Sequence, residues 1–139
     1  MSEADDMNRS LVLMAIWHGG EFLMQDRTHK NEGIGFFGGR RKQDEEPLLG
    51  AIRETEQETG LEIKSEEVRE LATCYDDGWE IHAFQTSIPF DEKRPGVPRP
   101  EGQVIYLSPL DAWQQHRLMP ATRAVLKETI VLPNGTIDN

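Results

Sequence analysis

Two glutamates stand one helical turn apart within an acidic stretch of the sequence. Glu54 and Glu58 are separated by four positions, so on an α-helix their side chains share a face. Like charges at this spacing repel each other, and helix stability alone therefore does not favour the pair. A divalent cation reverses that repulsion, and Mg²⁺ takes oxygen ligands from a few carboxylates together with substrate phosphates. The pair indicates a cation site, and the alternative is an ordinary surface helix with a solvated acidic face.

The residues around this pair predict where its helix begins and ends. Pro47 suits the first helical turn, and the acidic residues 44–46 before it suit the positive end of the helix dipole. Gly60 followed by Leu61 predicts a left-handed stop with an apolar contact after it. We therefore expect a loop from the glycine pair Gly38–Gly39, then about four turns of helix. Glycines in that loop let the backbone approach a ligand closely.

The segment from Gly39 to Leu61 resembles the signature of the Nudix hydrolases. That signature is a glycine, five residues, a glutamate, seven residues, Arg-Glu, an apolar residue, any residue, Glu-Glu, any residue, a glycine and an apolar residue. The matching residues, all in register, are Gly39, Glu45, Arg53, Glu54, Glu58, Gly60 and Leu61. Two positions depart from it, because Thr55 replaces the apolar residue and Gln57 replaces the first glutamate of the final pair.

The resemblance implies a set of metal ligands. Glutamates at the positions of Glu54, Gln57 and Glu58 usually bind the metal in this family, with help from a glycine carbonyl at the position of Gly38. It further implies Mg²⁺ as the cofactor, for which Mn²⁺ can substitute. Gln57 keeps a carbonyl oxygen but lacks the charge, so we expect one metal site to be weaker. Two interpretations stay open: an enzyme with fewer or more weakly held metals, and a module that binds a nucleotide without fast hydrolysis.

The same resemblance implies catalytic roles. The arginine that matches Arg53 orients the catalytic carboxylates through salt bridges, here with Glu45, and thereby holds a metal ligand in place. The alternative for Arg53 is an ordinary surface ion pair. Nudix proteins often carry one more acidic residue in the loop before the last strand, and Glu101 is our candidate for it. Either Glu54 or Glu101 then acts as the base, and both assignments stay open.

Three further residues are candidates for substrate binding. Arg40 follows the glycine pair at a position where Nudix proteins often carry a basic residue, so we expect it to contact phosphate oxygens. Tyr75 and Trp79 are aromatic side chains able to stack on a nucleobase, and the alternative for both is packing in the core or at its rim. Arg41 either meets the same anionic oxygens or offsets the acidic residues that follow it.

Length and charge limit the classes of protein that fit. With 139 residues and a net charge of −10, we expect one domain over residues 1–139, with residues 1–9 and 133–139 as flexible tails. An acidic surface disfavours nucleic acid polymers and anionic membranes as partners, although a bound cation still admits a phosphate ligand. The single cysteine, Cys74, excludes an internal disulfide, and no apolar run or signal peptide opposes a cytoplasmic assignment. A homodimer stays open.

Apolar and alternating stretches predict a mixed α/β domain. The predicted strands are 10–18, 21–25, 71–75, 79–88 and 104–107, and further helices are expected at 108–112 and 121–130. Residues 26–35 and the proline-rich residues 89–100 are expected to be loops. Taken with the resemblance, this order implies the Nudix α/β/α sandwich with a mixed β-sheet.

The residues and the resemblance together predict a function. We expect Mg²⁺-dependent hydrolysis of the pyrophosphate bond in a nucleoside diphosphate linked to another group, most simply a nucleoside triphosphate. Water attacks a phosphorus while the cation neutralises charge on the phosphate oxygens. The first alternative is a nucleotide-binding module with weak or no hydrolysis because of Gln57, and the second is a dinucleoside polyphosphate hydrolase. A third is an acidic protein-binding domain without nucleotide affinity.

Overall fold

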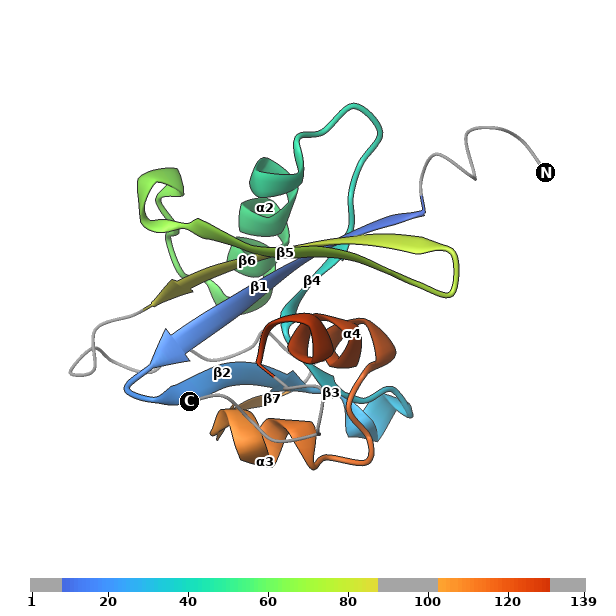
Figure 1. Cartoon of the computed structure of the whole chain (residues 1–139). Helices are drawn as coiled ribbons and strands as arrows, with labels where there is room; N and C mark the ends of the chain where they lie inside the picture. The colour runs from blue at the N-terminus through green and yellow to red at the C-terminus, as the bar shows by residue number, and fades with distance from the viewer. Residues whose placement is uncertain (1–8, 88–102, 131–139) are drawn as a thin grey trace.

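A computed structural model of the chain describes residues 9–87 and 103–130. Seven strands form one sheet, and the longest helix follows the fourth strand (Figure 1). The strands are β1 (Ser10–His18), β2 (Glu21–Asp26), β3 (Ile34–Gly35), β4 (Phe37–Arg40), β5 (Arg69–Asp76), β6 (Trp79–Ser87) and β7 (Gln103–Leu107). The helices are α2 (Pro47–Thr59), α3 (Pro109–Trp113) and α4 (Pro120–Thr129), with the 3₁₀ turns η1 (Thr28–Lys30) and η2 (Ser65–Glu67).

β1 lies at the centre of the sheet and makes it mixed. It pairs in parallel with β6 from the Ser10–Glu80 pair to the Trp17–Ser87 pair. On its other side it pairs antiparallel with β4 near its start and with β2 near its end. The strand order β3-β2-β1-β6-β5 is completed by β4 beside β1 and β7 beside β2. The predicted mixed sheet is therefore confirmed.

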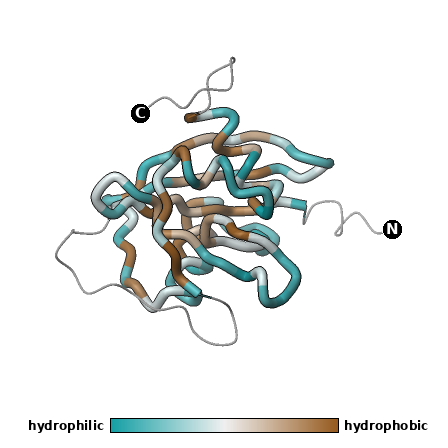
Figure 2. The backbone as a smooth tube through the Cα atoms, turned by 90° about the horizontal axis from the view of Figure 1, so that it is seen from below, coloured by the Kyte–Doolittle hydropathy of each residue, from teal (hydrophilic) through white to brown (hydrophobic). Residues whose placement is uncertain are grey.

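Helices cover both faces of this sheet, as the alternation of apolar side chains along β1 requires. Val12, Met14 and Ile16 are fully buried in a cluster with Ala51 of α2. Leu13 points to the other face and joins a second cluster, to which α3 and α4 contribute. Figure 1 shows α2 on one side of the sheet and α3 and α4 on the other, and Figure 2 shows the apolar segments gathered in the interior. The predicted α/β/α sandwich is confirmed.

Most predicted elements are present, with ends that shift by one or two residues. The loop prediction was wrong at three places: Thr28–Lys30 form η1, Ile34–Gly35 form β3, and the glycine pair belongs to β4. Two glycines give β4 little intrinsic preference for a strand, so its pairing with β1 decides its conformation. This correction matters for the site, because a strand holds the glycine pair in fixed register with β1.

Some predictions lie outside the described residues, namely the loop 89–100, Glu101, the tail 133–139 and most of the tail 1–9. Arg9 is described, and its carbonyl oxygen accepts a hydrogen bond from the Glu80 N–H at 3.0 Å. This bond lies next to the Ser10–Glu80 pair of β1 and β6, and the flexible tail stays a prediction. Within the described residues, no helix is long and apolar enough to cross a membrane.

Candidate active site

α2 begins and ends where the sequence predicts, and this fixes which of its side chains face the sheet. Pro47 occupies the first turn, and Gly60 ends the helix in the left-handed conformation with a φ of 75°. Glu58 is 9% exposed, so a charged side chain belongs to the packed face rather than to a solvated one. The buried residues of α2 are Gly50, Ala51, Thr55, Glu58 and Thr59.

Glu54 and Glu58 both lie against the glycine pair of β4. The Gly38 N–H donates a hydrogen bond to Glu58 Oε1 at 2.8 Å. A Cβ on Gly39 would lie 2.8 Å from Glu54 Cδ, so a side chain at that position would require the Glu54 carboxylate to move. Gly38 itself has a φ of 151°, and a Cβ there would lie 2.0 Å from the Val12 carbonyl oxygen. The structure thus brings together three of the four residues predicted for the metal site.

Arg53 connects Glu54 to Glu45. Its Nε donates to Glu45 Oε2 at 2.8 Å, its Nη2 donates to Glu45 Oε1 at 3.0 Å, and its Nη1 donates to Glu54 Oε1 at 2.9 Å. The hydrogen bonds from Arg53 lower the pKa of Glu45 from 4.5 to about 2, against the opposing effect of burial. The same bonds raise the pKa of Arg53. The predicted Arg53–Glu45 ion pair is present, and the catalytic role of Arg53 stays a prediction.

Gln57, the fourth predicted metal-site residue, lies on the exposed side of α2 beside the buried Glu58. Among the described residues, no group of three His, Cys, Asp or Glu side chains is arranged to hold a metal ion. Glu54 and Glu58 supply two carboxylates beside β4, and Gln57 carries a neutral amide oxygen one position before Glu58 in the sequence. This donor set fits a hard cation such as Mg²⁺, which completes its shell with water and substrate phosphates.

Arg40 and Trp79 meet although they are far apart in the sequence. The guanidinium carbon of Arg40 lies 5.3 Å from the centre of the Trp79 ring, which is a cation–π contact. Arg40 pairs with Leu11 of β1, which in turn pairs with Ile81 of β6. Because Ile81 belongs to the core cluster on the α4 side, alternation puts Arg40 and Trp79 on that face. The two residues therefore lie on the face of the sheet opposite to α2.

Tyr75 lies on the other face of the same hairpin. It pairs with Glu80 in the β5–β6 ladder, next to the Asp76–Trp79 pair. Consecutive strand residues point to opposite faces, so Tyr75 and Trp79 cannot enclose one nucleobase between them. Tyr75 is 71% exposed, and its hydroxyl donates to Glu80 Oε2 at 3.4 Å. A hydrogen bond with His82 is the main cause that lowers the pKa of Glu80.

Sequence reasoning missed the residues that hold the loop between β4 and α2. Arg41 donates from Nε to Ser10 Oγ at 3.0 Å and from Nη1 to the Glu45 carbonyl oxygen at 2.8 Å. These contacts are to protein oxygens, and neither of the two roles expected for Arg41 describes them. Gly50 is the second missed residue, because a Cβ there would lie 2.8 Å from Glu45 Oε1. A glycine inside a helix was the one signal in the sequence for such a close approach.

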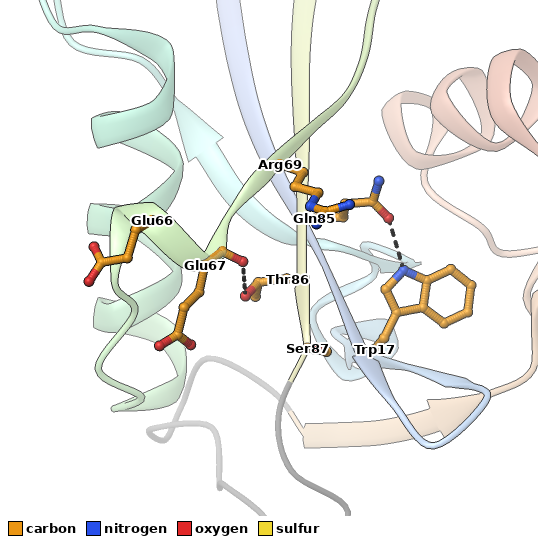
Figure 3. A pocket seen from close by; sticks show the side chains of 7 residues that line it. All are labelled: Trp17, Glu66, Glu67, Arg69, Gln85, Thr86 and Ser87. Atoms are coloured by element: carbon orange, nitrogen blue, oxygen red, sulfur yellow. Dashed lines mark hydrogen bonds between the residues drawn. The ribbon is translucent and has the colours of Figure 1, made fainter.

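A separate hollow of about 320 Å³ lies near the end of β6 and the start of β5. Its lining, shown in Figure 3, consists of Trp17, Glu66, Glu67, Arg69, Gln85, Thr86 and Ser87. Trp17 Nε1 donates to Gln85 Oε1 at 3.2 Å, and Thr86 Oγ1 donates to the Glu67 carbonyl oxygen at 3.0 Å. None of the predicted site residues lines this hollow, and Ser87 precedes residues outside the described part, so we do not assign it to the site.

A comparison with protein families agrees with this geometry. The model of the NUDIX domain matches residues 7–129. The chain therefore belongs to the Nudix family, and the prediction of a Nudix-type hydrolase is confirmed. Nudix enzymes generally use divalent metal ions, which agrees with the pair of carboxylates at Glu54 and Glu58. Among curated proteins, none matches the chain.

Solved structures show the same fold. The E. coli ORF135 protein is 26% identical, with 85% of each chain covered and a TM-score of 0.62. An Ap4A hydrolase from C. elegans is 16% identical over 85% of this chain and 93% of that chain, with a TM-score of 0.65. The E. coli dihydroneopterin triphosphate pyrophosphohydrolase is 16% identical over 88% of this chain and 94% of that chain, with a TM-score of 0.64. At 16% identity the last two show the fold alone.

Proposed function

We propose that this protein is a Mg²⁺-dependent hydrolase of the pyrophosphate bond in a nucleoside diphosphate linked to another group, with a nucleoside triphosphate as the simplest substrate. Mn²⁺ is expected to replace Mg²⁺. The observation that carries the proposal is the position of Glu54 and Glu58 against the backbone of Gly38 and Gly39. Two carboxylates beside a backbone without side chains suit a cation that a substrate phosphate also contacts.

The residues of the site divide the chemical work. Glu54 and Glu58 would hold the cation, with the Gln57 amide oxygen and the Gly38 carbonyl oxygen as weaker ligands. When bound, the cation neutralises charge on the phosphate oxygens. Arg53 restricts the orientation of Glu54, because the same guanidinium that donates to Glu54 is also held by the Glu45 carboxylate.

The attacking water needs a base, and two residues are proposed for it. Glu54 is one, because its carboxylate lies at the glycine pair and is held in place by Arg53. Glu101 is the other, and it lies outside the described residues. Replacing each by glutamine and measuring the pH dependence of kcat separates them, since loss of the base removes the acidic limb of the profile.

Arg40 and Trp79 lie on the face of the sheet opposite to α2, and they are proposed to contact parts of the substrate other than the phosphate at the cation beside Glu54 and Glu58. Arg40 supplies a cation for phosphate oxygens, and the Trp79 ring beneath it supplies an aromatic surface for a nucleobase. Tyr75 would contribute separately, from the opposite face of the hairpin. Its high exposure is the observation that keeps a dinucleoside polyphosphate, with a second nucleoside to bind, as the alternative substrate.

A nucleotide-binding module with weak or no hydrolysis is the rival function, and Gln57 is the residue that favours it. Phosphate release from a panel of nucleotides, with Mg²⁺ or Mn²⁺, decides between the two when Gln57→Glu and Glu58→Gln are compared with the native protein. The enzyme interpretation requires native turnover that Glu58→Gln abolishes. If the native protein is inactive and Gln57→Glu creates activity, the module is the better description.

Domain organisation, compartment, binding partner and oligomeric state are the remaining proposals. We propose that residues 1–139 act as one domain in the cytoplasm, where the single and buried Cys74 would stay reduced. The partner is a nucleotide rather than a nucleic acid polymer or a membrane, because the net charge is −10. A homodimer stays open, and sedimentation velocity of the purified full chain at several concentrations measures it.

A further inference from the structure

We propose that Arg41 is a positioning residue, which fastens the loop between β4 and α2 to the start of β1 and so keeps Glu45, Arg53 and Glu54 in place. This inference rests on the proposed function, because it assigns a task to Arg41 within the same site. It differs from the two roles that the sequence suggests for Arg41, contact with the substrate and compensation of nearby acidic side chains.

Arg41 is bound to the first residue of β1 at two points. Its backbone N–H donates to the Ser10 carbonyl oxygen at 2.8 Å, and its Nε donates to the Ser10 hydroxyl at 3.0 Å. Ser10 is 3% exposed, so the anchor belongs to the interior of the protein. The Nη1 atom of the same guanidinium contacts the loop, because it donates to the Glu45 carbonyl oxygen at 2.8 Å.

Glu45 is the residue that this contact immobilises. Its N–H donates to the Lys42 carbonyl oxygen at 3.1 Å, and its Oε1 accepts from the Lys42 N–H at 2.9 Å. Two hydrogen bonds therefore join Lys42 and Glu45 across the turn that they form. The absence of a side chain at Gly50 lets the Glu45 carboxylate lie directly on α2. Arg41 thus fixes the backbone of Glu45, while Lys42 and Gly50 fix its side chain.

The contacts form a closed ring between β1 and the carboxylate of Glu54. The ring runs from Ser10 through Arg41, Glu45 and Arg53 to Glu54. Glu54 then lies against Gly39, whose partner in the sheet is Val12, two residues after Ser10. A ring that begins and ends on one strand transmits a displacement of the loop to the proposed metal ligand. Arginine suits this role because its planar donors serve two acceptors in different directions, which the single ammonium of lysine does not.

Four variants test the inference, and one of them, Arg41→Lys, keeps the positive charge but not the planar donors. Arg41→Met keeps an unbranched apolar stem and removes the donors, and Ser10→Ala removes one acceptor only, with less risk to folding. Lys42→Met is the matched control, because it removes a positive charge from the same loop and leaves the backbone contacts of Lys42 intact. Thermal unfolding establishes that each variant is folded before it is compared with the native protein.

The first measurement is the affinity for Mn²⁺, by electron paramagnetic resonance of the free ion. Arg41→Met is expected to bind Mn²⁺ about tenfold more weakly, Ser10→Ala to show a smaller loss in the same direction, Arg41→Lys to restore little, and Lys42→Met to stay within twofold. If Arg41→Met binds Mn²⁺ as the native protein does while its KM for nucleotide rises, Arg41 contacts substrate and the inference is wrong.

The second measurement is amide hydrogen exchange over residues 42–54, and it needs neither metal nor activity. Faster exchange in Arg41→Met than in Lys42→Met is expected, because the loop loses its attachment to β1. Unchanged exchange contradicts the inference. Should the native protein bind no Mn²⁺, the proposed function fails, and the exchange result still decides whether Arg41 holds the loop.

Discussion

The carboxylate of Glu54 lies so close to Gly39 that a Cβ at residue 39 would come within 2.8 Å of its carboxyl carbon. This contact joins the helix that carries the acidic pair to the strand that carries the glycine pair. The backbone of Gly39 lies on one side of the Glu54 carboxylate, and Arg53 Nη1 donates a hydrogen bond to the same carboxylate. The present position of the Glu54 carboxylate therefore requires a glycine at residue 39 of β4.

Gly39→Ala is expected to displace Glu54 and to lower kcat on the order of 100-fold, because a shift of about 1 Å in a catalytic group has effects of that size. Gly20→Ala is the control. A Cβ on Gly20 would meet open space, but Gly20 has a φ of 125°, so alanine there strains the backbone away from the site. Kinetics and thermal unfolding of both variants check this. Equal activity in Gly39→Ala and the native protein would mean that Glu54 does not need its present position.

The Glu45–Arg53 ion pair makes stability depend on pH in the acidic range. The folded pKa of Glu45 is about 2 and its ordinary value is 4.5, so the stabilisation is fully present above about pH 5 and is lost as the pH falls towards 2. Glu45→Gln should therefore flatten the pH dependence of the unfolding free energy between pH 5 and pH 2. Urea unfolding at several pH values measures it, with Glu46→Gln as the control. Parallel curves for Glu45→Gln and the native protein speak against this pair.

Thr55 stands where the Nudix signature has an apolar residue, and its burial is complete. Its hydroxyl donates to the Ala51 carbonyl oxygen at 2.7 Å. This bond stays within the helix, where a Thr hydroxyl bound to the carbonyl four residues earlier slightly destabilises the helix. Thr55→Val is expected to leave activity unchanged and to raise the unfolding free energy by up to about 1 kcal/mol.

Thr59 provides the comparison for that experiment. Its hydroxyl donates to the Thr55 carbonyl oxygen at 2.7 Å and also accepts from the Leu61 N–H at 3.1 Å, just past the end of the helix. Thr59→Val removes this acceptor and is expected to lower the unfolding free energy by about 1 kcal/mol. Urea unfolding of both variants tests the difference in sign, and a larger loss in Thr55→Val than in Thr59→Val contradicts it.

The opposite positions of Trp79 and Tyr75 predict different effects on substrate binding. Arg40→Met and Trp79→Leu are expected to raise KM for a nucleoside triphosphate about tenfold each, because they remove a phosphate contact and a stacking surface worth about 1 kcal/mol or more. Tyr75→Leu is expected to raise KM less for a triphosphate than for a dinucleoside polyphosphate. Steady-state kinetics with both substrates measure this. If only Tyr75→Leu raises KM for the triphosphate, Arg40 and Trp79 do not contact the substrate.

Much of the fold follows from local features of the sequence. The conformation of β1 follows from its own apolar run. Each end of α2 is likewise determined locally, by Pro47 at the start and by Gly60 at the end. The ion pair of Arg53 with Glu45 was also predictable, since the resemblance names both residues. β4 was not predictable, because its conformation comes from pairing with β1 and not from its own glycine-rich sequence.

The candidate site was predictable only in part, for a similar reason. Arg41 reaches Ser10 across more than thirty positions, a distance in sequence at which no periodicity or spacing rule applies. The position of Tyr75 and Trp79 on opposite faces of the hairpin was predictable from the sequence, however. The two-residue turn Asp77–Gly78, with φ values of 49° and 82°, fixes the register of the hairpin and so the face of each aromatic side chain.

The central claim is that the carboxylates of Glu54 and Glu58 bind a divalent cation. Titration of the native protein and of Glu58→Gln with Mn²⁺, followed by electron paramagnetic resonance with and without a non-hydrolysable nucleotide, tests it most directly. We predict that the native protein binds Mn²⁺, that the nucleotide strengthens this binding, and that Glu58→Gln weakens it at least tenfold. A native protein that takes up no Mn²⁺ even with nucleotide, or a Glu58→Gln variant that binds it equally well, would contradict the claim.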